Sequence, residues 1–220
     1  MRPWLLSLSL LLLAGCSRFT RYDVYVTGYT GGPPSTIAPG SSIAVVENPR
    51  ARNPLLEQEV ANKVRRALQA QGFRMAPPAD AVAFVRLAYG TEAVVDNHDE
   101  FRFVPGQTST VKDSTGKVIG SVTSDPSFIS VPTTSTRSDP WLTLTAIPRR
   151  SGSDSTTAKP LWIGESKSTG ANLPLRSMID YLLVPAAANF GRNHLQTKEV
   201  LRADDQRVAA VAASAVNAVP

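Results

Sequence analysis

The sequence predicts an α+β fold: a two-layer sandwich in which two main helices cover one face of a mostly antiparallel or mixed sheet. Two segments, near residues 54–71 and 175–190, repeat apolar residues every three or four positions, which is the spacing of an amphipathic helix. Around them lie shorter apolar or alternating runs that are typical of strands. With 42% hydrophobic residues among 220, the chain can bury one sizeable core.

The leader, residues 1–15, has the features of a cleaved secretory signal peptide. Arg2 supplies the positive start, and seven leucines follow between Trp4 and Leu13. This apolar run is too short to cross a membrane as a helix, which takes about 20 residues. We therefore expect residues 1–15 to be removed.

The end of the leader, Leu13-Ala14-Gly15-Cys16, resembles the bacterial lipobox. In that motif the cysteine receives a diacylglycerol and becomes the first residue of the mature chain. Cys16 is the only cysteine, so we favour its lipidation over an ordinary signal peptide with a chance cysteine. Several acyl chains together give durable anchoring. Ser17 stands where an aspartate is typical of inner-membrane retention, and we therefore expect an outer-membrane lipoprotein that faces the periplasm.

The mature chain divides into three parts. Residues 16–42 form the lipidated N-terminus and a tether, because residues 18–26 favour a short strand but glycine and proline dominate residues 28–40. Residues 43–195 form the periplasmic α/β domain. Residues 196–220 form an Ala/Val-rich tail, which we expect to be a frayed helix because small side chains bury little apolar area.

The first half of the domain contains the clearest helix. After a short buried strand at 43–46, Asn53 can cap the helix N-terminus and Pro54 occupies its first position, where a missing N–H costs nothing. Glutamates near the start and basic residues near the end match the helix dipole. Gly72 then provides the left-handed residue that ends the helix.

The middle of the domain is rich in serine and threonine. A buried strand at 80–89 is followed by an acidic turn and a continuation of the sheet at 101–104. Fifteen of the 32 residues from 107 to 138 are serine or threonine. Within this segment, residues 112–117 predict a hairpin turn between two short strands. Strands this polar are expected at a sheet edge or in a surface flap.

Two further strands and a second helix complete the domain. Residues 141–147 alternate apolar and polar side chains as a half-buried strand does, and residues 161–165 form another strand. The second helix covers residues 175–190. Pro185 lies inside it and should kink or split it, because proline removes the donor to the carbonyl of Tyr181.

Several of these segments resemble the 4136 family of domains of unknown function, which are bacterial lipoproteins. The resemblance rests on the Asn53-Pro54 start and Gly72-Phe73 end of the first helix, on the strand after Ala79-Asp80 and on the Trp162-Ile163-Gly164 strand. It covers residues 43–190, implies a two-layer α/β domain and supplies no catalytic residues. The family's usual aromatic-rich opening strand is replaced here by the Gly/Pro stretch.

Composition argues against several kinds of chemistry. One cysteine excludes an internal disulfide and a Cys-cluster metal site. The net charge is +5, and the basic residues are spread among acids rather than gathered into a block. We therefore expect no nucleic-acid partner. The chain has no Gly-x-Ser-x-Gly motif, and its closest approach to a phosphate loop, Thr115-Gly116-Lys117, is followed by Val118 in place of Ser or Thr.

The two histidines are the remaining candidates for chemistry. His98 lies in an acidic run with Asp96 and Asp99, which could hold a metal ion. The run lacks calcium-loop spacing, however, and is better explained as a solvated turn. His194 is expected at a helix end. Trp141 and Trp162 lie on predicted strands. Either could stack on a sugar, but aromatic residues on strands are more often part of the core.

We therefore expect a lipoprotein with no catalytic residue, metal or cofactor, whose domain binds a partner or assists assembly in the cell envelope. Acylated Cys16 contacts membrane lipid, and an envelope protein or peptidoglycan is the candidate partner. The candidate surfaces are the Ser/Thr-rich segment around Thr123 and the basic turn of the first helix around Arg66. Two alternatives remain open: an envelope hydrolase or metal-dependent enzyme that uses the His98 cluster, and a structural protein that self-associates through tail residues Val208, Val211 and Ala215.

Overall fold

The computed structural model describes residues 20–31, 37–149, 159–170 and 173–213. The predicted signal peptide and the lipidation site at Cys16 lie outside the described residues. The chain divides into two compact units. The main unit contains Met1–Glu92 and Ser138–Pro220, and the hairpin unit contains Ala93–Arg137.

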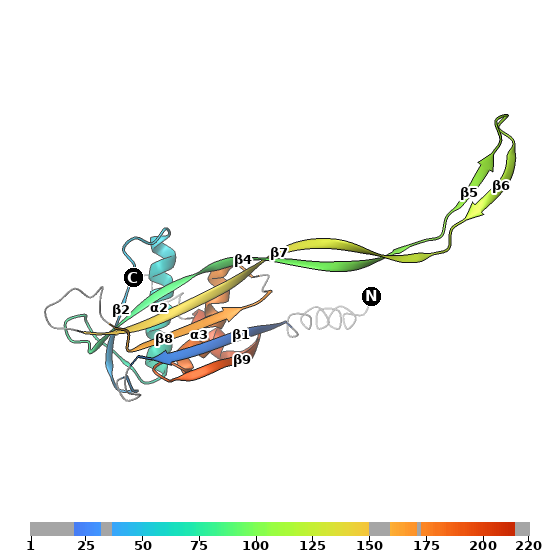
Figure 1. Ribbon diagram of the computed structural model, residues 1–220. Coiled ribbons are helices and arrows are strands. Elements are labelled where there is room, and N and C mark those ends of the chain that lie inside the picture. Colours follow the sequence, from blue (N-terminus) through green and yellow to red (C-terminus); the bar gives the residue numbers. More distant parts are fainter. Residues whose placement is uncertain (1–19, 32–36, 150–158, 171–172, 214–220) are drawn as a thin grey trace, which may run out of the picture. The chain divides into compact units, whose positions relative to one another are not determined.

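The main unit is built on a seven-stranded sheet with the order β3-β2-β4-β7-β8-β1-β9 (Figure 1). β2 pairs in parallel with β3 and β4, whereas β8 pairs antiparallel with β7 and β1, and β1 pairs antiparallel with β9. The strands are β1 Arg21–Thr30, β2 Ser42–Val46, β3 Arg74–Met75, β4 Ala83–Val104, β7 Ser127–Pro148, β8 Trp162–Ser168 and β9 His194–Arg202. β4 and β7 continue from the main unit into the hairpin unit.

Three helices form the second layer: α2 Pro54–Ala70, α3 Leu175–Ala188 and α4 Gln206–Ala213. α2 contacts β2 and β3, α3 contacts β8 and β1, and α4 contacts the other two helices. α2 begins as predicted, since the Asn53 side chain accepts a hydrogen bond from the Leu56 N–H at 3.1 Å. It also ends as predicted, because Gly72 has a φ of 88°. The predicted α+β class is therefore confirmed. No helix among the described residues has the length and apolarity to cross a membrane.

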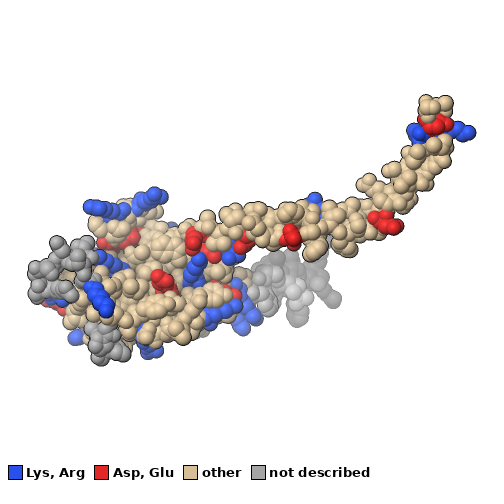
Figure 2. Space-filling view, viewed as in Figure 1, with Lys and Arg blue, Asp and Glu red and all other residues tan. Residues whose placement is uncertain are grey.

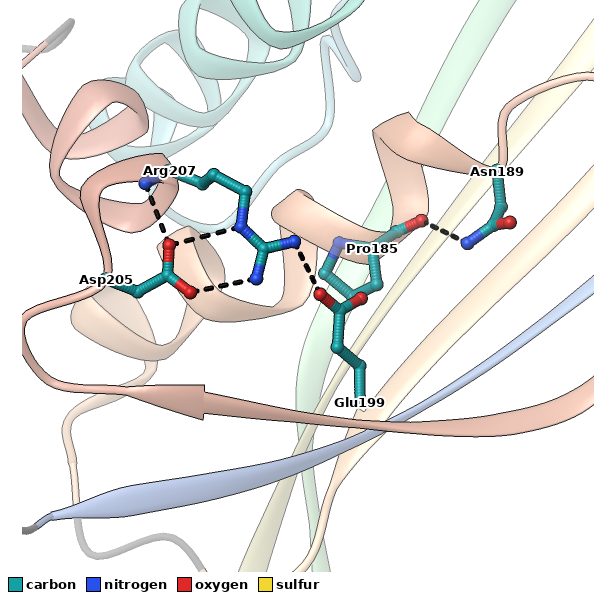
Figure 3. Close-up of polar contacts among 5 residues, drawn as sticks. All are labelled: Pro185, Asn189, Glu199, Asp205 and Arg207. Atoms are coloured by element: carbon teal, nitrogen blue, oxygen red, sulfur yellow. Dashed lines mark hydrogen bonds and ion pairs between the residues drawn. The ribbon is translucent and has the colours of Figure 1, made fainter.

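α3 runs without interruption through Pro185, so the proline does not split it. Pro185 lies in the last turn, where its missing N–H removes only one bond of the helical ladder. The side-chain amide of Asn189 donates to the Pro185 carbonyl at 2.9 Å and closes the helix end (Figure 3). Residues 178–187 are buried, and this packing holds the helix in place.

The core lies between the sheet and the helices, and Trp162 on β8 is its largest fully buried side chain. Its ring packs against Phe190 at 4.7 Å between centroids, and its Nε1 donates to the Arg192 carbonyl at 2.9 Å. Gly164 lies beside the same ring, since a Cβ atom there would come within 2.0 Å of it. Trp162 is therefore a core residue rather than an exposed sugar platform. Trp141 on β7 is half-buried.

The sheet extends beyond the domain boundaries that the sequence suggested at residues 43 and 195. β1 falls in the expected tether and pairs on both sides, with β8 and with β9. β9 covers the start of the expected tail, and α4 follows it. At Gly28 of β1 an added Cβ atom would meet the His194 imidazole of β9 at 2.6 Å. Gly28 therefore marks a close approach inside a strand rather than the start of a loop.

The hairpin unit consists of strands and turns. It contains the distal parts of β4 and β7 and a two-stranded antiparallel sheet of β5 Thr108–Lys112 and β6 Val118–Thr123 (Figure 1). The predicted hairpin turn between these two strands is confirmed. The Asp113 carboxylate accepts hydrogen bonds from the N–H groups of Thr115 and Lys117 at 2.9 Å each, which fixes the turn.

The acidic run at residues 96–100 is part of β4, so the prediction of a turn there is wrong. Its polar side chains find partners across the hairpin on β7. Arg137 pairs with the Asp96 carboxylate, and the Thr134 hydroxyl donates to Asn97 Oδ1 at 2.9 Å. These cross-strand contacts stabilise an extended backbone in a sequence whose local preference is a turn.

Candidate binding surfaces

The hairpin unit carries an exposed aromatic patch, made of Phe101, Phe103 and Phe128. The exposed fractions of these residues are 73%, 54% and 72%. Alternation along β4 places Phe101 and Phe103 on one side of the strand, and the Phe103 and Phe128 rings lie 5.3 Å apart between centroids. No described helix belongs to this unit, so nothing within the unit covers the aromatic patch.

The same two strands have open edges. β2 pairs with β4 over residues 83–86, and β8 pairs with β7 over residues 141–146. In the described part of the chain, residues 93–104 and 127–136 therefore have a strand partner on one edge alone. Unpaired backbone N–H and C=O groups on an exposed edge are a template for another strand. Figure 2 shows mostly uncharged side chains on the visible face of this unit, with isolated charges between them.

The Ser/Thr-rich end of the hairpin unit exposes apolar side chains as well as hydroxyls. The hydroxyls of Thr108 and Thr123 bond to each other at 3.0 Å. The large apolar side chains of β6 are exposed too: Val118 54%, Ile119 64% and Val122 62%. This end therefore offers apolar contacts as well as hydroxyls.

Most of the basic turn of the first helix does not form the exposed charged surface that the sequence predicted. Lys63 is only 3% exposed, because its ammonium group pairs with Asp180 of α3 at 2.7 Å and with Glu59 at 3.1 Å. Arg176 of α3 pairs with the same Glu59 at 2.7 Å. These four residues form a cluster that joins α2 to α3.

Burial and pairing act in opposite directions on the two carboxylates of this cluster. Burial raises the pKa of Asp180 above its ordinary value, and the hydrogen bond and charge of Lys63 offset this only in part. Burial also acts to raise the pKa of Glu59, but hydrogen bonds from Arg176 and Lys63 outweigh it and leave that pKa lowered. The cluster is therefore a structural connection between α2 and α3, in which Lys63 and Asp180 are buried and the Arg176 side chain is exposed.

α2, α3 and α4 line an open pocket of about 270 Å³. Two arginines line it, Arg66 of α2 and Arg207 of α4. The Arg207 guanidinium is held by the Asp205 carboxylate at 2.8 and 3.1 Å and by Glu199 at 2.6 Å (Figure 3). The half-buried Arg66 has no ion pair or hydrogen bond among the described residues. The apolar walls are alanine and valine from all three helices, among them Ala67, Ala70, Val184, Ala187, Ala210 and Val211.

The histidine candidates do not form a metal cluster in the residues that the structure describes. Alternation along β4 directs His98 and Asp96 to one side of the strand and Asp99 to the other. Across the described residues, no group of three His, Cys, Asp or Glu side chains is placed so that it could hold a metal ion. His194 begins β9, so its expected place at a helix end is wrong. Both of its ring nitrogens are buried without a hydrogen-bond partner in the described part of the chain.

The other described residues that the sequence singled out lie in a turn of the hairpin unit and in α4. Residues 115–117 belong to the turn before β6, and no helix follows them as one would in a phosphate loop. Of the tail residues named for self-association, Val208 is buried and Val211 is partly buried, both against the core of the main unit. Ala215 lies outside the described residues. Val208 and, in part, Val211 therefore contribute to the packing of the main unit itself.

Sequence reasoning missed the aromatic patch and the pocket. Phe101 and Phe103 are two positions apart in an otherwise polar run. In a strand this spacing places both on one face, so the sequence did contain a signal for an exposed aromatic face. The pocket arises where three helices rich in small residues meet, and alanine alone gives no signal for a cavity.

No family model matches the sequence, and no curated protein matches it either. Among solved structures, the fold is similar to that of a PDZ domain protein from Parabacteroides distasonis, with a TM-score of 0.50, 8% sequence identity and 87% of this chain covered. The match spans 41% of that protein's length. At this identity it shows the fold alone: a two-layer α+β domain.

Two other solved structures are similar at lower TM-scores. The PelC dodecamer from Paraburkholderia phytofirmans gives a TM-score of 0.41 at 14% identity, covering 78% of this chain and 99% of the PelC chain. A DUF4136 family protein from Bacteroides thetaiotaomicron gives a TM-score of 0.35 at 10% identity, covering 76% of this chain and 92% of that one. The latter carries the name of the family that the sequence motifs resemble.

Proposed function

We propose that this protein is a noncatalytic binding or assembly module of the cell envelope, anchored to the outer membrane through acylated Cys16 and facing the periplasm. The observation that carries the binding role is the aromatic patch of the hairpin unit, whose three phenylalanines are 54%, 72% and 73% exposed. Contiguous exposed apolar side chains mark interaction sites, because leaving them in water is unfavourable.

The open edges of β4 and β7 favour a protein partner over peptidoglycan. A protein segment can add a strand to either edge through main-chain hydrogen bonds, while the aromatic patch supplies apolar contacts. Peptidoglycan offers no such strand. An isolated two-stranded hairpin is also marginally stable in water, so a partner that adds a strand would stabilise the hairpin unit as well.

The membrane anchor is supported by the sequence Leu13-Ala14-Gly15-Cys16 and by the absence of any other cysteine. The test is metabolic labelling with a fatty acid, followed by membrane fractionation, in cells that express the full chain or its Cys16→Ser variant. We expect label in the wild-type protein alone, with the labelled protein in the membrane fraction. A wild-type protein without label would overturn the anchor.

The binding role is tested by photocrosslinking in living cells. A photoreactive residue is placed at Phe128 in the aromatic patch or at Thr123 on β6, with a control at Leu55 of α2, which is 79% exposed. We expect one envelope protein to be captured reproducibly from the hairpin positions and not from Leu55. Capture of peptidoglycan alone, or equal capture from all three positions, would contradict the proposal.

A further inference from the structure

The pocket between α2, α3 and α4 has the size and lining of a site for an apolar chain. Its volume is about 270 Å³, just below the range of drug-sized pockets, about 300–1,000 Å³. Its walls are alanine and valine apart from Gln71 and the two arginines. A space of this size and lining suits one flexible hydrocarbon chain, and it is too small for a lipid with two long chains.

The positive charges around the pocket are only partly balanced by the residues that the structure describes. Asp205 and Glu199 together occupy the Arg207 guanidinium, whose pKa is raised by these hydrogen bonds. Arg65, the neighbour of Arg66 on α2, is likewise bound, to Glu47 at 2.8 Å. Arg66 differs from both, since it has no anionic partner among the described residues. One positive charge is therefore left for an anion beside the apolar walls.

We propose that this pocket binds a single-chain fatty carboxylate, with the hydrocarbon chain among the alanines and valines and the carboxylate on the Arg66 guanidinium. A guanidinium and a carboxylate match in geometry and can form two parallel hydrogen bonds. The apolar chain leaves water when it enters the pocket, which supplies affinity that a short carboxylate lacks. This site is in the main unit and is independent of the aromatic patch.

Calorimetry on the full chain tests the proposal. The chain carries Cys16→Ser so that it is not acylated, and it is purified without detergent, which would compete for the pocket. The probes are decanoate below its micelle concentration, decanol and acetate. We expect one decanoate to bind per chain, decanol to bind more weakly, and acetate not to bind.

Two variants separate the head group from the chain. Arg66→Gln should weaken decanoate binding about tenfold and leave decanol binding unchanged, since one charge-assisted contact is lost. Arg65→Gln is the matched control on the same helix and should have no effect. Ala188→Phe should fill the pocket and weaken both ligands, with circular dichroism used to verify folding; Arg66→Gln remains decisive if this variant does not fold.

Three results would overturn the proposal. The first is the absence of decanoate binding to the full chain. The second is equal binding by the Arg66→Gln and Arg65→Gln variants. The third is binding that appears only in a chain ending at Ala213, which would assign the pocket to residues 214–220 of the protein itself.

Discussion

Lys63 of α2 and Asp180 of α3 form an ion pair at 2.7 Å, although Lys63 is only 3% exposed. Taking two charges out of water is unfavourable unless each has a well-placed partner. The pair therefore specifies how α2 packs on α3. Replacing one partner should destabilise the protein more than replacing both.

The first prediction concerns this pair. Lys63→Met leaves the Asp180 carboxylate buried without its partner and should lower the free energy of unfolding by about 3 kcal/mol. The double variant Lys63→Met/Asp180→Leu should recover most of that loss, because no unpaired charge remains. Urea unfolding followed by circular dichroism measures both. If the single and double variants were equally unstable, Lys63 and Asp180 would not be coupled.

The second prediction concerns pH. The pKa of Glu59 is lowered below its ordinary value of 4.5, so the stabilisation from this carboxylate is present above that value and is lost as the pH falls below it. The wild-type protein should therefore be more stable than Glu59→Gln at about pH 6, and the difference should shrink at about pH 3. The raised pKa of Asp180 acts in the opposite direction, and the charge of Glu59 contributes to that rise, so the difference between the two proteins reports Glu59 together with its effect on Asp180. A difference that is constant over this range would contradict the assignment.

The third prediction concerns the close approach of Gly164 to Trp162. A Cβ atom at Gly164 would meet the indole ring at 2.0 Å, so Gly164→Ala should destabilise the main unit by about 1–3 kcal/mol. Gly120→Ala on β6 is the control, because an added Cβ atom there has nothing within 4 Å. Thermal unfolding distinguishes the two variants. Equal melting temperatures would show that the Trp162 ring moves aside freely.

The fourth prediction separates binding from stability in the aromatic patch. Phe101→Ser and Phe103→Ser change side chains that are 73% and 54% exposed. Together they should alter the stability of the main unit by less than about 0.5 kcal/mol, as exposed substitutions do. A large loss of stability in urea would instead mean that the phenylalanines serve the fold.

Local chemistry predicted several elements because the decisive contacts lie within a few residues. Asn53 caps the N–H of Leu56 three residues on, and Asp113 accepts from Thr115 two residues on, so both features could be read from short motifs. Gly72 ends α2 through its own backbone freedom. The α+β class follows from the same local patterns.

Contacts between distant residues decided the elements that sequence reasoning missed. The acidic run of β4 is a strand because Asp96 meets Arg137, which is 41 residues away. Lys63 is buried because Asp180 comes from another helix. A single sequence does not reveal such pairings, since the local preference of Asp and Asn is a turn and that of lysine is the surface.

The central claim is that the aromatic patch of the hairpin unit binds an envelope protein. The most direct test is the yield of the crosslink from a photoreactive residue at Phe128, compared between the otherwise wild-type chain and the Phe101→Ser/Phe103→Ser background in living cells. We predict one protein partner in the first case and at least a tenfold lower yield in the second, a change of about 1.4 kcal/mol in binding. An unchanged yield, with both chains acylated and folded, would contradict the claim.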